Sequence, residues 1–176
     1  PEVVMAFTEH GFTGLSHLYH DFYRTNLCRS KFVQEVQRPV LINSWEAAFM
    51  DFDDVKLVEI AKAAKDMGVD LLVMDDGWFG KRDDDNSGLG DWYVNEKKIK
   101  CGLHKLVEQI NDIGMKFGIW FEPEMVSEDS DLYRAHPEWA MQIPGRHAVR
   151  SRNQMVLDMS RKDVQDYLIK KVNGIL

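Results

Sequence analysis

The chain has 176 residues, 44% of them hydrophobic and 29% charged, a balance typical of globular proteins rather than disordered or fibrous ones. Its formal net charge is −7, with acids and bases mixed along the sequence, which excludes a basic stripe and makes nucleic acid an unexpected partner. No apolar run approaches the roughly 20 residues of a membrane span, the opening PEVVMAFTEH lacks signal-peptide features, and two cysteines are too few for a disulfide framework, so we expect a cytoplasmic protein that inserts in no membrane.

Residues 1–38 differ in character from the rest of the chain and are predicted to form a lead-in segment. Within them, Leu15, Leu18, Tyr19 and Phe22 recur at the spacing of one face of a helix. We interpret this segment as a linker helix that enters from something upstream.

From residue 39 onward, short apolar runs alternate with amphipathic stretches. The runs at 40–45, 69–76 and 115–126 predict strands, and residues 153–160 predict a further extended piece. The stretches at 53–68, 102–114 and 161–176 predict helices, because their apolar residues fall on one face and glycines stand at helix ends. This alternation predicts an α/β fold in which parallel strands are joined by helical crossovers.

Two parallel architectures fit this alternation, a barrel and a doubly wound sheet. No glycine-rich phosphate-binding fingerprint follows any of the predicted strands, so the doubly wound nucleotide-binding version has no support and a barrel is favoured. Residues 39–176 fall short of the roughly 200 residues that an eight-fold barrel needs. They are therefore predicted to be the first half of a (β/α)8 barrel.

Indoles stand at the carboxyl ends of the strands predicted at 40–45, 69–76 and 115–126, joined by acids in the last two, and this is the end where parallel sheets place their sites. Indole faces suit the C–H side of a sugar ring, and carboxylates accept hydrogen bonds from hydroxyl pairs, so the set predicts a sugar site. Plainer interpretations remain open: helix caps for the aspartates, core packing for the indoles, and ion pairs between the glutamates and Arg146, Arg150 or Arg152. The acids and indoles that make up this predicted sugar site are Trp45, Asp75, Asp76, Trp78, Trp120, Glu122 and Glu124.

Metal sites have less support in the sequence. His17 and His20 lie three residues apart on the predicted first helix, without a third ligand at a sensible spacing. The acidic run that begins at Asp83 suggests a calcium loop, but Val94 occupies the position of the closing glutamate. We therefore interpret the histidines as solvated or structural and the acidic run as a polar loop, with no metal expected.

Four strings make the sequence resemble bacterial α-galactosidases of glycoside hydrolase family 36 over essentially its whole length. They are RPVLINSWEA, LLVMDDGWFGKRDDDNSGLGDW, GMKFGIWFEPEMVSEDSDLYRAHPEW and RNQMVLDMS, in this order. The resemblance implies that residues 1–38 link an upstream β-sandwich domain to a catalytic (β/α)8 barrel, of which residues 39–176 are the N-terminal half.

The same resemblance implies the site residues. Asp75 and Asp76 would bind hydroxyls of a terminal galactose, chiefly those at C4 and C6, while Trp45 and Trp120 would line the pocket and Arg152 would add a contact. The family is retaining and uses two aspartates, a nucleophile and an acid/base. Both are expected beyond Leu176, so no catalytic residue is assigned within this chain, which would be inactive alone.

The function implied is hydrolysis of terminal α-D-galactosyl groups from oligosaccharides of the raffinose and melibiose type, without metal or organic cofactor, by a homo-oligomer. An α-N-acetylgalactosaminidase or an α-galactosyl transferase of related fold stays open, and so does a non-catalytic half-barrel or sugar-binding fragment. Because a half-barrel leaves two sheet edges unpaired, we also expect the chain on its own to associate or aggregate.

Overall fold

The computed structural model describes residues 3–28, 38–143, 145, 146 and 148–175. Its contacts divide the chain into two units, Pro1–Pro39 and Val40–Leu176, which are described separately below. The part of the lead-in prediction that falls on residues 29–37 lies outside the described residues.

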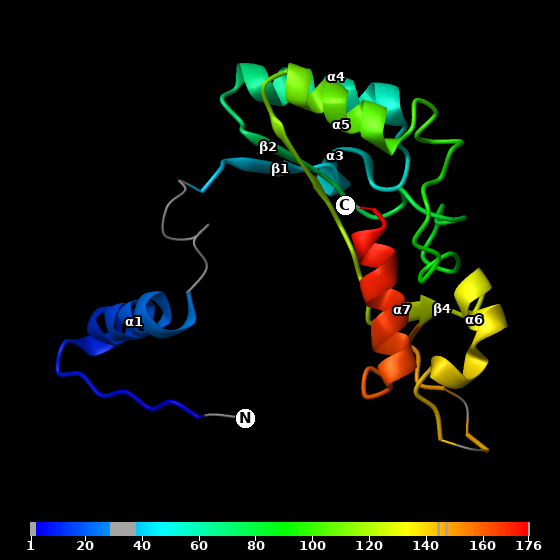
Figure 1. Cartoon of the computed structure of the whole chain (residues 1–176). Coiled ribbons are helices and arrows are strands. Elements are labelled where there is room, and N and C mark those ends of the chain that lie inside the picture. Colours follow the sequence, from blue (N-terminus) through cyan, green and yellow to red (C-terminus); the bar gives the residue numbers. More distant parts are fainter. Residues whose placement is uncertain (1–2, 29–37, 144, 147, 176) are drawn as a thin grey trace. The chain divides into compact units, whose positions relative to one another are not determined.

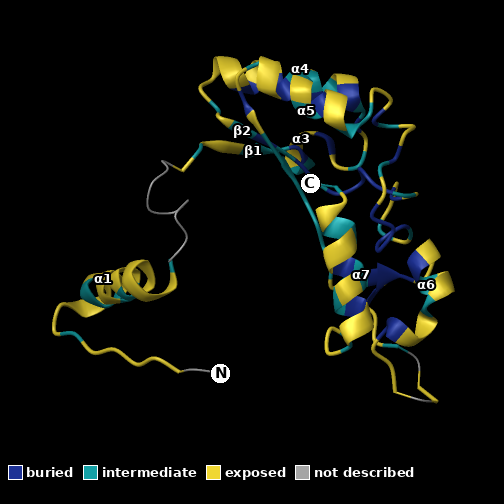
Figure 2. Ribbon diagram, in the orientation of Figure 1, coloured by how far each residue is buried: buried dark blue, intermediate teal, exposed yellow. Residues whose placement is uncertain are grey.

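The first unit contains the helix predicted for the lead-in segment. Helix α1 spans Gly11–Phe22 and continues as one π-helical turn, η1, over Tyr23–Leu27. The hydroxyl of Tyr19 donates a hydrogen bond of 3.2 Å to the carbonyl of Val4, which ties the preceding strand-like segment to the helix. None of the residues of α1 is buried, and Leu15, Tyr19 and Phe22 of its apolar stripe are only partly covered by the described residues (Figure 2).

A three-stranded parallel sheet is the frame of the second unit (Figure 1). Its strands are β1 (Leu41–Asn43), β2 (Leu71–Met74) and β3 (Lys116–Ile119), and their order in space follows the chain. The short helix α3 (Trp45–Ala48) and helix α4 (Asp54–Asp66) connect β1 to β2, and helix α5 (Leu103–Asp112) lies between β2 and β3. The prediction of parallel strands with helical crossovers is confirmed.

Helices α4 and α5 cover one face of this sheet (Figure 1), and alternation along the strands decides which residues they bury. Leu72 and Met74 are fully buried, whereas Leu71 and Val73, which alternate with them, are only half-buried. On the helix side, the predicted stripes are buried at Leu57, Ala61, Ala64, Leu106 and Ile110. The opposite face of the sheet stays more open, and it carries Asn43 in register with Val73.

The remaining elements extend from the carboxyl side of β3. They are β4 (Met125–Ser127), α6 (Asp131–Ala135), the 3-10 turn η2 (Pro137–Trp139), β5 (Gln154–Val156) and α7 (Lys162–Asn173). Strands β4 and β5 pair antiparallel, with Val126 opposite Met155. In α7, Val164 and Leu168 are buried.

At this end of the chain one strand prediction needs correction, and another is confirmed with a pairing that the sequence did not predict. The strand expected over 115–126 ends at Ile119 and resumes only at Met125, since Pro123 between them has no N–H for a ladder. The extended piece at 153–160 is present as β5, but it pairs with β4 rather than joining the parallel sheet.

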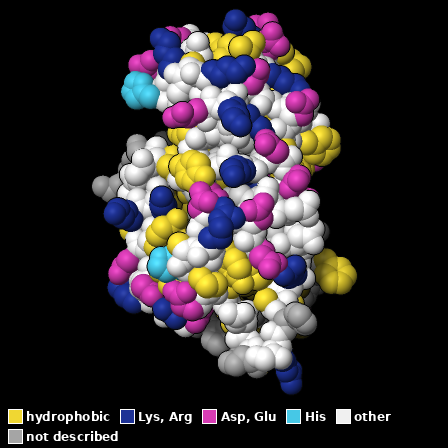
Figure 3. Space-filling view, turned by 90° about the vertical axis from the view of Figure 1, so that its right-hand side faces the viewer, with side chains coloured by type: hydrophobic (Ala, Val, Ile, Leu, Met, Phe, Trp, Pro, Cys, Tyr) yellow, Lys and Arg dark blue, Asp and Glu magenta, His cyan; other side chains and the backbone are white. Residues whose placement is uncertain are grey.

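The surface agrees with the mixed charge pattern of the sequence. On the face shown in Figure 3, lysine and arginine side chains alternate with aspartate and glutamate, and the described side chains there form no continuous basic stripe. Within the described part of the chain, no helix has both the length and the apolar character to span a bilayer.

Candidate functional site

The carboxyl ends of the three parallel strands lie level with one another. Asn43 is in register with Val73, and Met74 is in register with Ile119, so the residues that follow each strand leave the sheet at one edge. Neighbouring strands are about 4.8 Å apart, which places the ends of the two outer strands about 10 Å from each other. This separation is comparable with the width of one sugar ring and its hydroxyls.

Asn43 connects two of the predicted site residues. Its side-chain amide donates to Oδ2 of Asp75 at 2.5 Å, and its carbonyl oxygen accepts from the backbone N–H of Trp45 at 2.7 Å. The hydroxyl of the fully buried Ser44 accepts from the N–H of Asp75 at 3.0 Å. These bonds hold the Asp75 carboxylate next to the backbone of Trp45 at the ends of β1 and β2.

Asp75 remains partly accessible, and its carboxylate accepts from neutral groups. Its other oxygen, Oδ1, accepts from the backbone N–H of Asp76 at 2.7 Å. A carboxylate has about four acceptor positions. Asp75 therefore keeps acceptor capacity for hydroxyl groups of a ligand.

Asp76 lies in a different environment, since the chain turns sharply after it. Gly77 has a φ of 101°, which a residue with a side chain rarely adopts. The Asp76 carboxylate is 2% exposed and is held by the guanidinium of Arg82, itself fully buried. Nε of Arg82 donates to both oxygens at 3.0 and 3.2 Å, and Nη2 donates to Oδ2 at 2.9 Å.

The network continues from Arg82 to Arg152, another of the predicted site residues. Nη2 of Arg82 also reaches Oδ1 of Asp85 at 3.3 Å, and the same oxygen accepts from Nη2 of Arg152 at 2.9 Å. An unbroken series of hydrogen bonds thus runs from Trp45 through Asn43, Asp75, Asp76, Arg82 and Asp85 to Arg152. Four of the five predicted residues belong to this one series.

The fifth, Trp120, follows β3 and is half-buried. Its carbonyl accepts a hydrogen bond of 3.0 Å from the indole N–H of Trp78. Trp78 is itself fully buried and packs against Phe79, Trp92 and Phe121. Trp78 is among the residues of the predicted sugar site, but its ring belongs to the core, the alternative left open for the indoles, and its N–H supports the backbone of Trp120.

Glu122 faces the same strand ends. Burial raises its pKa, the charge of Glu124 raises it further, and the cation of Arg152 opposes this shift. Oε2 of Glu122 is buried without a hydrogen-bond partner among the described residues.

The ion pairs considered for Glu122 and Glu124 are not formed within the described part of the chain. Arg150 pairs with Glu128 instead, and Arg152 pairs with Asp85.

The acidic run has structural partners as well. Asp83 pairs with Lys98 at 2.8 Å, and Asp84 accepts from the N–H of Asn86 at 2.7 Å. His20 lies 3.5 Å from the hydroxyl of Ser16. Among the described residues, no group of three or more histidine, cysteine, aspartate or glutamate side chains could hold a metal ion.

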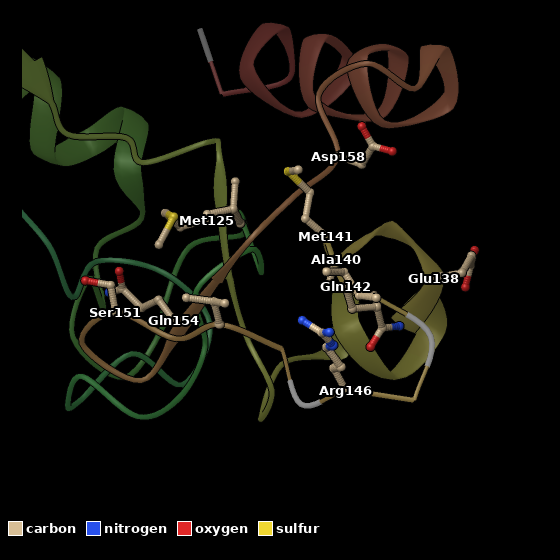
Figure 4. A pocket seen from close by; sticks show the side chains of 12 residues that line it. Met125, Glu138, Ala140, Met141, Gln142, Arg146, Ser151, Gln154 and Asp158 are labelled. Carbon is tan, nitrogen blue, oxygen red and sulfur yellow. The ribbon is translucent and has the colours of Figure 1, made fainter.

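A separate pocket of about 670 Å³ lies between the β4–β5 ribbon and the segment after η2 (Figure 4). Met125, Met141 and Val156 supply apolar surface, and Gln154 and Arg146 supply polar groups. None of the five predicted site residues lines it. The chemistry of the strand ends, rather than the size of this hollow, therefore defines the candidate site.

Sequence reasoning missed Asn43, Arg82 and Asp85 as members of the site. Asn43 directly precedes the Ser-Trp pair that ends β1, and Arg82 is the first arginine after the two aspartates. A buried carboxylate requires a cation, so asking which arginine serves Asp76 could have found Arg82. The sequence contains no comparable signal for the hydrogen bond between Asp85 and Arg152, which lie 67 positions apart.

An α/β chain that gathers acids and indoles at the carboxyl ends of parallel strands falls in the class of proteins that bind ligands at that end of the sheet. A model of the Melibiase family matches residues 1–176, and the chain belongs to that family.

Several relatives show how far this similarity extends. The chain is 55% identical over 176 residues to a bifunctional alpha-galactosidase/sucrose kinase, AgaSK, of Mediterraneibacter gnavus, covering all of this chain and 19% of that protein. A solved structure of a variant of the alpha-galactosidase AgaA from Geobacillus stearothermophilus, in complex with stachyose, matches with a TM-score of 0.92 and 49% identity over 98% of this chain and 24% of the other. Another AgaA variant, in complex with raffinose, matches with a TM-score of 0.88 and 50% identity over 92% and 22% of the two chains. The chain thus spans about a fifth to a quarter of the length of these relatives.

Proposed function

We propose that this chain supplies part of the galactose pocket of a retaining α-galactosidase that removes terminal α-D-galactosyl groups from raffinose- and stachyose-type oligosaccharides. The observation that carries the proposal is the hydrogen-bond series joining Trp45, Asp75, Asp76 and Arg152 at one edge of a parallel sheet. Membership of the Melibiase family and the oligosaccharides bound by two AgaA variants support it.

Each residue has a part in this proposal. Asp75 accepts hydrogen bonds from galactose hydroxyls, and a hydrogen bond to a charged group contributes about 1.5–3 kcal/mol. Trp45 and Trp120, which follow the two outer strands β1 and β3, are proposed to offer their indole surface to the sugar ring. Arg152 adds donors, because it uses one nitrogen on Asp85 out of a guanidinium with five N–H groups.

Asp76 has a narrower part. Arg82 occupies both of its oxygens, yet a carboxylate has about four acceptor positions, so one hydroxyl can still be accepted beside the guanidinium. The hydroxyl must reach a side chain that is 2% exposed. A site built in this way rejects a sugar whose hydroxyl has the wrong orientation, because the buried acceptor is then left unpaired.

We do not assign bond cleavage to these acids. The Asp76 carboxylate is neutralised by a guanidinium, which suits it to neither attack nor proton donation. The retaining pair is proposed to lie beyond Leu176. The cytoplasmic location and the homo-oligomeric state stay predictions.

The test is hydrolysis of an aryl α-galactoside and of raffinose by the full-length protein that carries this sequence, with an aryl α-N-acetylgalactosaminide as the competing substrate. We expect hydrolysis of the galactosides, with the α-anomer of galactose released first. Hydrolysis of the N-acetylated substrate alone would indicate an α-N-acetylgalactosaminidase instead. If neither the galactosides nor the N-acetylated substrate are hydrolysed, the proposed function is wrong.

A further inference from the structure

The acidic loop Asp83–Gly88 follows the aspartate pair, and the proposed function places none of its side chains against the sugar. At its centre, Oδ1 of Asp85 accepts hydrogen bonds from two arginines, Arg82 at 3.3 Å and Arg152 at 2.9 Å. The three side chains are exposed to different degrees: Arg82 0%, Asp85 48% and Arg152 56%. Asp85 therefore joins a buried guanidinium to an exposed one through a single oxygen.

The buried end of this link is rigid. Arg82 donates to both oxygens of Asp76 and, through Nη1, to the carbonyl of Ser87 at 3.1 Å. All its side-chain nitrogens thus have acceptors on the strand end or in the loop. The position of Asp85 is consequently tied to that of Asp76.

The exposed end of the link is strained. Ser151 and Gln154 exchange backbone hydrogen bonds of 3.0 and 2.9 Å around a two-residue turn, in which Arg152 has a φ of 51° and Asn153 a φ of 60°. Positive φ at both positions is the pattern of a type I′ turn, which favours Asn or Gly and not Arg. Such a conformation persists where the surroundings hold it.

The acidic loop supplies that support at two successive positions. Arg152 donates to Asp85, and the side-chain amide of Asn153 donates to Oδ1 of Asn86 at 2.7 Å. Two neighbouring turn residues therefore bind two neighbouring loop residues across 67 positions of sequence. Arg152, which the proposed function places against the sugar, is thus one of the two residues in the strained conformation.

We infer that Asp85 is a positioning residue, which fixes the guanidinium of Arg152 relative to the Asp76 carboxylate so that both meet one terminal galactose. This inference rests on the proposed function. Asp85 itself touches no substrate. It acts by holding Arg152 with one nitrogen and leaving the other donors free for the ligand.

The experiment compares Asp85→Asn with Asp83→Asn in the full-length protein that carries this sequence. Both variants remove one negative charge from the same loop, but among the described residues the Asp83 carboxylate pairs with Lys98 and with neither guanidinium. For an aryl α-galactoside, we expect Asp85→Asn to raise KM and the galactose inhibition constant about three- to tenfold, with kcat changed less than about twofold. Asp83→Asn should leave all three unchanged, and Asp85→Glu should recover part of the loss.

A second arm asks whether Asp85 acts through Arg152. In an Arg152→Ala background, Asp85→Asn should change the galactose inhibition constant less than about twofold, because the group it positions is gone. An equal effect in both backgrounds would overturn the inference, and so would equal effects of Asp83→Asn and Asp85→Asn.

A third arm is independent of catalysis. Amide hydrogen exchange should become faster at residues 151–154 in Asp85→Asn and remain as in the wild type in Asp83→Asn, with helix α4 unaffected in both. If the wild type hydrolyses no galactoside, the proposed function fails while this arm still tests the link. Unchanged exchange at residues 151–154 would refute the link even in an active enzyme.

Discussion

Two adjacent regions at the end of β2 each contain an aspartate carboxylate, but they place it in opposite environments. In the strand-end region, made of Asn43, Ser44, Trp45 and Asp75, the carboxylate of Asp75 accepts from neutral groups and stays partly open. In the loop region, residues 76–92, the carboxylate of Asp76 is buried against Arg82. Asp91 is also buried there and accepts from two backbone N–H groups of α6. The comparison shows that one carboxylate remains available to a ligand while its neighbour mainly organises the fold.

The largest effect should come from removing the cation of the loop region. Arg82→Met leaves the Asp76 carboxylate buried and unpaired, which costs about 3–5 kcal/mol of folding free energy. Tryptophan fluorescence during chemical denaturation measures this, because Trp78 and Trp92 are buried nearby. In Arg82→Met with Asp76→Asn, part of the loss should return, and a single variant as stable as the wild type would contradict the division into two regions.

A smaller effect, on binding rather than folding, is expected in the strand-end region. Asp75→Asn removes a charged acceptor, so galactose should bind about 10- to 100-fold more weakly while the denaturation midpoint changes little. Titration calorimetry of the full-length protein provides the affinity. Asp70→Asn, at the opposite end of β2, is the matched control and should keep the wild-type affinity. A large loss of folding stability in Asp75→Asn would contradict the comparison, because Asp75 would then support the fold as Asp76 does.

The third prediction concerns the capping role of Asp91. Its oxygens accept from the N–H groups of Asp131 and Leu132 at 2.9 and 3.0 Å, and burial raises its pKa. Asp91→Ala should cost about 1–2 kcal/mol, as the loss of a helix cap does. Asp129→Asn removes an exposed acid paired with Arg134 and should stay within about 0.5 kcal/mol of the wild type in the same denaturation assay.

The smallest expected effect is a pH dependence at Glu122. Its pKa is raised in the folded protein by burial and by the charge of Glu124, so ionising it disfavours the folded state as pH rises through that pKa. Glu122→Gln should therefore raise the melting temperature more at about pH 7 than at about pH 3.5, on either side of the ordinary glutamate pKa. Glu124→Gln, which lowers the pKa of Glu122, should show the same trend more weakly. A variant that gains more stability at the acidic pH would contradict the assigned direction.

Much of the fold could be predicted from local pattern. The helix over 54–66 is capped by Asp53, whose side chain accepts from the N–H of Lys56 at 2.9 Å, and its buried face is the stripe visible in the sequence. The parallel strands follow from the same alternation of apolar runs and amphipathic stretches. The apolar stripe of α1 was equally clear in the sequence, yet none of the residues of α1 is buried. An apolar stripe shows which face a helix can bury, but it does not show whether another element covers that face.

The candidate site could be predicted only in part. Strand ends locate Trp45, Asp75 and Trp120, since parallel strands deliver their following residues to one edge whatever the rest of the chain does. The burial of Trp78 and the pairing of β4 with β5 were not predictable in this way. Both depend on residues far along the chain that the local pattern does not mention.

The sequence by itself determined the order of the elements, the alternation that buries one face of each, and the strings that match the Melibiase family. Tertiary structure alone decided that Asp75 stays open while Asp76 closes on Arg82, and that Asp85 reaches Arg152. The physical reason is the separation along the chain over which each interaction acts. Hydrophobic periodicity and capping act within a few residues, whereas a buried charge is stabilised by whichever opposite charge the folded chain brings within a few ångströms.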